Sequence, residues 1–148
     1  MTHHSPRFGL RRGLAMLELT VVLTILLALI SVLALGSRAW LRDCDRASCI
    51  LTLHKVQLAT RSYQNLYGYS CGSSPNLENG SYNIAEHLRG KGYIAEDTFQ
   101  QTHGALKCPR GGIYTCPLPD HFPATGQLYM TCSLAESEDH RPTFHGGW

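Results

Sequence analysis

Residues 14–35 read LAMLELTVVLTILLALISVLAL, and this stretch decides the fold. Its 22 residues carry a single charged side chain, that of Glu18. At about 1.5 Å per residue, a helix of this length spans roughly 33 Å, which is close to the hydrocarbon thickness of a bilayer. Core helices of soluble proteins are rarely apolar on every face for so long. The stretch therefore predicts a transmembrane helix.

The helix is expected to continue beyond the apolar stretch. No proline interrupts residues 14–67, and Gly36 is the only glycine among them. Because prolines and glycines are the main helix breakers, the sequence predicts one helix from Leu14 to about Tyr67, roughly 80 Å long. Its second half, residues 36–67, is the amphipathic continuation.

This second half carries apolar side chains on two sides. At 100° per residue, one stripe comprises Trp40, Cys44, Ala47, Leu51 and Leu58, and the other comprises Cys49, Leu53, Val56, Tyr63 and Tyr67. A surface helix usually has one apolar stripe. Two stripes predict burial on two sides, one against the helix's own domain and one against other chains.

The residues before the apolar stretch form a short, polar and basic leader, residues 1–13 (MTHHSPRFGLRRG). The apolar stretch is longer than the hydrophobic region of an ordinary secretory signal peptide, which argues against that interpretation. Gly13 is followed by the hydrophobic Leu14, and Glu18 lies five residues after the glycine. This arrangement resembles the class III signal of the prepilin and pseudopilin family, with Leu14 in place of the usual Phe.

The resemblance implies that prepilin peptidase cuts the chain after Gly13 and that the new N-terminus at Leu14 is methylated. It also implies that Glu18 meets the N-terminal amine of a neighbouring subunit and sets the axial register of assembly. A carboxylate in an apolar helix is costly unless it is paired. The alternative is that Glu18 only reaches the lipid headgroups.

Residues 68–148 are expected to form a small globular domain. Residues 84–89 predict a short helix, and β-prone runs at 92–95, 112–115 and 127–132 predict a small antiparallel sheet packed on the long helix. The segments KCPRGGIYT and TGQLYMTCSL resemble a C-terminal pattern of secretion-type pilin-like proteins. The expected fold is therefore α+β and pilin-like.

The six cysteines all follow the apolar stretch, which suits a domain outside the cytoplasm. Cys44 and Cys49 cannot pair with each other on one helix, because they face opposite sides. Cys108 precedes one predicted strand and Cys132 ends another, so a disulfide between them is expected. Cys49 and Cys71 are further disulfide candidates, since sequence alone does not fix the pairing.

Two metal sites remain as alternatives, although we expect neither a resident metal nor a cofactor. The zinc candidates lack the tight C-x₂₋₄-C pairs of most zinc sites, because their nearest cysteines are spaced as Cys108-x₇-Cys116, and calcium-type ligand spacing is not diagnostic here. The zinc candidates are Cys108, Cys116, Cys132 and either His140 or His145; the calcium candidates are Glu136, Glu138 and Asp139.

The predicted function is that of a structural filament subunit and not of an enzyme. No nucleophile elbow, HExxH motif or phosphate-binding glycine loop occurs, and no basic stripe indicates nucleic-acid binding. The resemblance implies a subunit of a type II secretion pseudopilus or a type IV pilus-like filament. The alternatives are a minor pilin that acts as a binding module in adhesion or DNA uptake, and a single-pass anchor that never polymerises.

The resemblance also implies partners and a location. The partners would be other pilin-like subunits in a homo- or hetero-oligomer, prepilin peptidase, an inner-membrane assembly platform and membrane lipid. The chain would cross the bacterial inner membrane once, with a cytoplasmic N-terminus and a periplasmic C-terminal domain.

Overall fold

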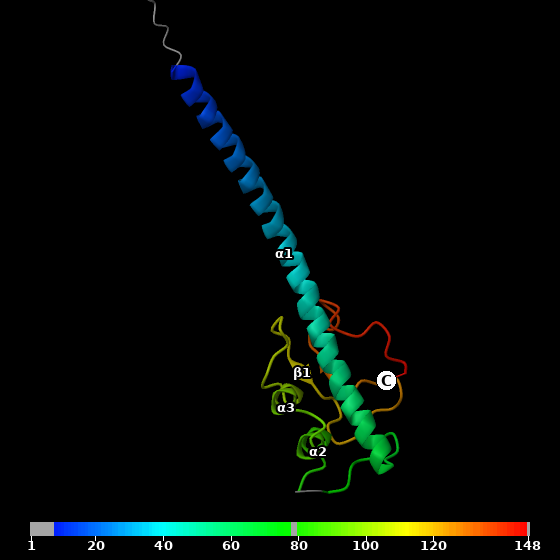
Figure 1. Ribbon diagram of the computed structural model, residues 1–148. Helices are drawn as coiled ribbons and strands as arrows, with labels where there is room; N and C mark the ends of the chain where they lie inside the picture. The colour runs from blue at the N-terminus through cyan, green and yellow to red at the C-terminus, as the bar shows by residue number, and fades with distance from the viewer. Residues whose placement is uncertain (1–7, 78–79, 148) are drawn as a thin grey trace, which may run out of the picture. The chain divides into compact units, whose positions relative to one another are not determined.

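The computed structural model describes residues 8–77 and 80–147, with side chains from residue 16 onward (Figure 1). Its elements are α1 (Phe8–Tyr67), α2 (Ile84–Gly90), α3 (Glu96–Thr102), β1 (Tyr114–Thr115) and β2 (Thr131–Cys132). The chain divides into two compact units, Met1–Leu41 and Arg42–Trp148. A long apolar helix and a small antiparallel sheet confirm the predicted α+β class.

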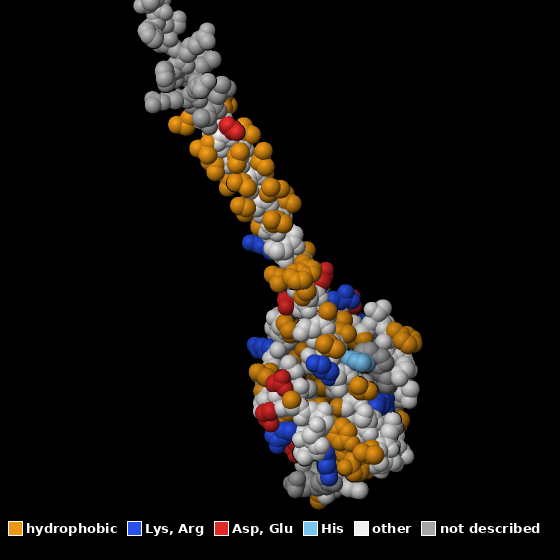
Figure 2. All heavy atoms as spheres, in the orientation of Figure 1, with side chains coloured by type: hydrophobic (Ala, Val, Ile, Leu, Met, Phe, Trp, Pro, Cys, Tyr) orange, Lys and Arg blue, Asp and Glu red, His pale blue; other side chains and the backbone are white. Residues whose placement is uncertain are grey.

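The first unit is the N-terminal part of α1, and every described side chain in it is exposed. Hydrophobic side chains cover the surface of this part of the helix (Figure 2). Its few hydroxyl groups bond back to the helix itself; Thr20, for example, donates to the Leu17 carbonyl at 2.9 Å. The helix is long and apolar enough to cross a membrane.

The helix begins earlier than the sequence predicted. It starts at Phe8 instead of Leu14, so residues 8–13 of the predicted leader are helical. Extending an existing helix adds one backbone hydrogen bond per residue without a new nucleation cost, which outweighs the two glycines in this segment. The helix ends at Tyr67, where Gly68 adopts a positive φ of 71° that glycine tolerates.

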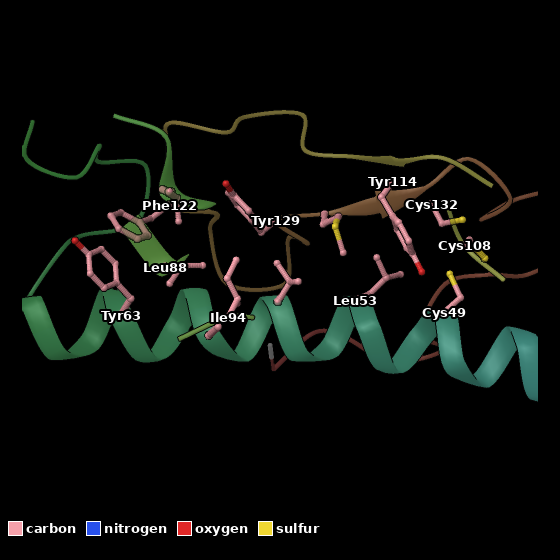
Figure 3. Packing of buried hydrophobic residues seen from close by; sticks show 14 residues of the cluster. Cys49, Leu53, Tyr63, Leu88, Ile94, Cys108, Tyr114, Phe122, Tyr129 and Cys132 are labelled. Atoms are coloured by element: carbon pink, nitrogen blue, oxygen red, sulfur yellow. The ribbon is translucent and has the colours of Figure 1, made fainter. Parts of the chain in front are cut away.

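In the second unit one face of α1 forms the base of the core. Cys49, Leu53 and Tyr63 lie along this face and point into the cluster of buried side chains (Figure 3). The prediction that one of the two stripes packs on the chain's own domain is confirmed, and the structure identifies it as the stripe with Cys49, although Tyr67 at the helix end is exposed. The other stripe, which includes Leu58, is exposed.

The sheet is smaller than the sequence predicted. In the described part of the chain it has two short strands, with Tyr114 opposite Cys132 and Thr115 opposite Thr131. The run at 92–95, predicted to be a strand, is a turn that leads into α3.

Helix α3 was not predicted from the sequence. Glu96 and Asp97 occupy its first turn, where negative charge is favoured by the helix dipole. Arg89 of α2 forms an ion pair with Glu96 at 3.4 Å and lies 4.1 Å from the centroid of the Phe99 ring. These contacts join α2 to α3.

The chain after β1 has little regular structure, and polar side chains of α1 hold it in place. The buried Gln57 donates its amide to the Gln127 carbonyl at 3.0 Å and accepts from the Tyr129 backbone at 2.8 Å. Arg61 donates to the carbonyl of Pro123 at 2.6 Å. Because these bonds satisfy buried backbone groups directly, the segment leading to β2 is positioned without a long strand ladder.

Candidate metal centre

Three cysteines and one histidine gather at one end of the core. The thiol sulfurs of Cys49, Cys108 and Cys132 and a ring nitrogen of His140 all lie within 4.8 Å of one another. The exposed fractions of the four residues are 0%, 3%, 4% and 1% respectively. Figure 3 shows the three sulfur atoms close together beside Tyr114. The cluster therefore combines four metal-binding side chains in a site closed to solvent.

The first two cysteines come from a helix and a turn. Cys49 lies on the buried face of α1, one helical turn before Leu53. Cys108 begins a tight turn in which the Gly111 N–H donates to the Cys108 carbonyl at 2.7 Å. Pro109 takes the second position of this turn, where its fixed φ is favourable, and Gly111 has a φ of 84°. The turn brings the Cys108 thiol against α1.

The third cysteine lies where the chain leaves no room for an extra side chain. Cys132 ends β2, and Gly112 passes beside its sulfur. A Cβ atom at residue 112 would lie 2.8 Å from the Cys132 sulfur and 2.9 Å from Cγ of Leu134. Such distances are too short for carbon, so a glycine at this position allows the close approach.

The histidine is placed by a loop that is bonded to α1. The backbone N–H of His140 donates to the Leu134 carbonyl at 3.2 Å, and this bond closes the loop after β2. Asp139, directly before it, has a positive φ of 54°. Arg46 of α1 donates through Nε to the Asp139 carbonyl at 2.8 Å and also forms an ion pair with the Asp139 carboxylate. The strained residue is thus held by a charged partner.

The two ring nitrogens of His140 face different groups. Nδ1 lies 3.2 Å from the Cys108 sulfur, whereas Nε2 lies 3.9 Å from a carboxylate oxygen of Glu138. Arg110 donates to that same oxygen at 3.1 Å and orients it. Histidines that bind metals usually present one nitrogen to the metal and the other to a carboxylate or carbonyl. The surroundings of His140 follow this pattern.

Burial affects the protonation of two thiols of the cluster when no cation is bound. It raises the pKa of the Cys49 and Cys132 thiols, because a buried thiolate loses its hydration. Both groups are therefore neutral thiols at physiological pH in the absence of a cation. Since thiolates are the species that bind metals, binding of a cation here releases protons.

The structure changes the predicted roles of the cysteines. All six cysteines lie in the described part of the chain, and all are free thiols. The predicted Cys108–Cys132 disulfide is therefore not formed. The two thiols instead share their surroundings with Cys49 and His140. The roles differ because α1 brings a third thiol, that of Cys49, to the place where the sequence predicted a pair of thiols.

Of the zinc candidates, Cys108, Cys132 and His140 lie together in the cluster, whereas Cys116 and His145 do not belong to it. Cys116 lies apart from the cluster and its thiol donates to the Thr102 carbonyl at 3.5 Å. His145 lines a different hollow, beside Leu118 and Tyr129. Cys49 was missed as a member of the cluster because it lies far from the others in the sequence, although its place on one of the two apolar stripes of the helix was predicted.

Cys71 lies away from this centre and does not pair with Cys49. Its thiol is exposed and accepts a hydrogen bond from the Gln64 amide at 3.5 Å. That bond, together with the nearby Arg61 guanidinium, lowers the pKa of Cys71. Because Gln64 lies about four helical turns after Cys49 on α1, a Cys49–Cys71 disulfide is out of reach.

The calcium candidates are each engaged by an arginine. The pairs are Glu136 with Arg141 at 2.9 Å, Glu138 with Arg110 at 3.1 Å, and Asp139 with Arg46. Carboxylates that point to separate guanidinium groups do not converge on a shared cation, so this segment is a charged loop.

The residues predicted for processing and assembly lie in the first unit. Gly13 and Leu14 belong to the backbone of α1, but their side-chain surroundings lie outside the described residues. Glu18 is exposed on the apolar helix. The partner predicted for Glu18 belongs to a second chain.

Comparison of this chain with protein-family models, curated proteins and solved structures found no match.

Proposed function

We propose that the chain is a membrane-anchored, pilin-like subunit that is cleaved by prepilin peptidase and assembled into a type IV pilus-like or type II secretion filament. The observation that carries the proposal is the unbroken helix α1. Its first part exposes apolar side chains all round, and its second part uses one face to hold a small domain. A helix of this kind serves as both an anchor and a packing element.

The exposed apolar surface of the first unit supports the proposal. Residues 16–35 present leucines, valines and isoleucines to their surroundings without a packing partner in the described chain. Contiguous apolar surface of this size is not stable in water, so lipid or other chains must cover it. In a filament subunit, this apolar surface would be covered first by the bilayer and then, after assembly, by neighbouring helices.

The free side of the second half of α1 also supports assembly. Leu51 and Leu58 are exposed on the stripe that does not face the core. The opposite stripe is occupied by the chain's own domain. Neighbouring subunits would bury this second stripe, which accounts for an apolar pattern on two sides of one helix.

Glu18 is the residue that connects anchoring with assembly. Cleavage after Gly13 would leave a positive amine on Leu14, at the start of the apolar helix. The amine and the Glu18 carboxylate are each costly in a water-free environment, and the cost falls when they pair. A neighbouring subunit shifted along the filament axis can supply the amine only at one register, so the pair would select that register.

Replacement of Glu18 tests the proposal. We expect Glu18→Leu to leave cleavage and membrane insertion largely intact but to reduce incorporation into filaments, whereas Glu18→Asp should be partly defective because its carboxylate reaches less far. Thr24→Leu is the matched control, because it places the same side chain on the same exposed helix without removing a charge. Co-purification with sheared filaments, compared with the membrane pool, gives the measurement.

The outcome also separates the alternatives. If Glu18→Leu assembles as well as the parent chain, the register role is wrong. If the parent chain never enters filaments, the chain is a single-pass anchor. A chain present in only a few copies per filament would be a minor pilin.

A further inference from the structure

We propose that Cys49, Cys108, Cys132 and His140 bind one structural zinc ion that joins the C-terminal segment to α1. The proposal rests on the geometry of the second unit and is independent of the filament function. It replaces the expectation that the chain has no resident metal.

The donor geometry fits a single tetrahedral ion. Zinc bonded at about 2.3 Å to sulfur and about 2.0 Å to nitrogen places its donors roughly 3.5 to 3.8 Å apart. The four donor atoms all lie within 4.8 Å of one another, and the Cys108 sulfur is 3.2 Å from Nδ1 of His140. Small side-chain adjustments, of about 1 Å or less, bring all four donors to bonding distance of one ion.

A disulfide does not satisfy this cluster as well as a cation does. Three thiols are present, so any disulfide between two of them leaves the third thiol outside the bond in a buried site, and a disulfide that includes Cys108 also removes the thiol that faces Nδ1 of His140. Unpaired buried polar groups are costly. One cation bonds to all four groups at once and replaces the three thiol protons, which pass to solvent.

The chemistry of the donors favours zinc over other cations. Thiolate and imidazole suit zinc, whereas calcium and magnesium take oxygen ligands. The spacing of the donors accommodates one ion and not a multi-iron cluster. Four protein donors leave no position for substrate or water, which is typical of a structural zinc site and not of a catalytic one.

The surroundings of the cluster supply the outer support that metal sites need. The Glu138 carboxylate faces Nε2 of His140 and is itself oriented by Arg110. A hollow of about 440 Å³, lined by Arg46, Arg110, Glu138 and His140 among others, lies on the histidine side of the site.

The ion would crosslink parts of the chain that otherwise have few regular contacts. The cluster joins α1, the turn before β1, the end of β2 and the loop after it. In the described residues the sheet has only two residues in each strand. Small domains with so little regular structure commonly depend on a covalent or metal crosslink, and metal binding then contributes directly to folding.

Metal analysis of the purified full-length chain in detergent tests the proposal. After exchange into metal-free buffer, we expect inductively coupled plasma mass spectrometry to find one equivalent of zinc per chain. Replacement of zinc by Co²⁺ should give the visible absorption of a tetrahedral site with thiolate charge-transfer bands. The cobalt spectrum is recorded on the unsubstituted chain, so it does not depend on whether a variant folds.

Substitutions then identify the ligands. Cys108→Ser and His140→Ala should lose most of the bound zinc. Cys116→Ser is the matched control, because it makes the same change at a thiol outside the cluster and should keep the full equivalent. A double His3→Ala, His4→Ala variant should also keep it, which excludes binding by the leader histidines.

Three results would overturn the proposal. The first is a purified chain without zinc whose non-reducing peptide map shows a disulfide between two of the three clustered cysteines. The second is full zinc content in Cys108→Ser. The third is stoichiometric iron or copper in place of zinc.

Discussion

At Gly112 the chain passes so close to the Cys132 sulfur that a methyl group does not fit. We expect Gly112→Ala to destabilise the second unit by about 1 to 3 kcal/mol, the usual cost of overpacking, because the added Cβ displaces Cys132 and Leu134. Thermal unfolding of the full-length chain, followed by near-ultraviolet circular dichroism of the buried tyrosines, measures the change.

Gly90→Ala is the matched control for this prediction. A Cβ atom at Gly90 meets no other atom within 4 Å, and the residue belongs to α2, where alanine is favourable. Equal stability of the two variants would show that the close approach at Gly112 does not exist.

Glu138 is predicted to tune the metal centre without binding the metal itself. Because its carboxylate faces Nε2 of His140, Glu138→Gln should weaken zinc binding by about 10- to 100-fold while one equivalent still binds at saturation. Competition with a chromophoric chelator measures the affinity. Glu136→Gln makes the same change two residues earlier, at a side chain paired with Arg141, and should leave the affinity unchanged.

Helix α1 has two different apolar faces in its second half. Leu53 is 2% exposed and lies in the core, whereas Leu51 is 52% exposed. Leu53→Ala should destabilise the second unit by about 2 to 5 kcal/mol through lost burial and the cavity left behind. Leu51→Ala should change its stability by less than about 0.5 kcal/mol, as is usual for surface positions.

The same pair of variants separates folding from assembly. Leu51→Ala should enter filaments less efficiently than the parent chain despite its normal stability, because the exposed stripe is the proposed packing surface. Chemical denaturation in detergent and recovery in sheared filaments are the two measurements. A loss of stability in Leu51→Ala equal to that of Leu53→Ala would contradict the burial pattern.

At the scale of the whole molecule, processing is predicted to remove the leader after Gly13. The three arginines of residues 1–13 leave with it, so the net charge of +2 becomes −1. Intact-mass measurement of the membrane-extracted chain should show a protein that starts at Leu14 and carries an N-terminal methyl group.

Gly13→Val should block this processing, since a branched side chain obstructs the protease site next to the cleaved bond. The valine variant and the parent chain are expressed with and without an active prepilin peptidase. A parent chain that retains Met1 in the presence of the active enzyme would refute the cleavage site.

The sequence predicted the elements that depend on local pattern. A long apolar run and the lack of breakers defined α1 and its end at Tyr67, and residues 84–89 marked α2. Helix α3 was missed because Phe99 is its single large apolar residue, so it shows no apolar periodicity, whereas α2 carries Ile84 and Leu88. The shortness of the sheet was missed because Gln57 and Arg61 replace strand pairing with side-chain bonds.

The sequence by itself determined that one helix carries an apolar segment and two stripes, with a short basic segment ahead of them, since these follow from residue order alone. Only the tertiary structure decided which stripe is buried and which cysteines meet. Cys49 lies far from Cys108 and Cys132 along the chain, and no spacing rule connects them. The three thiols and His140 converge because α1, a glycine turn and a loop bonded to Arg46 pack against one another, and such packing depends on the whole set of side chains at once.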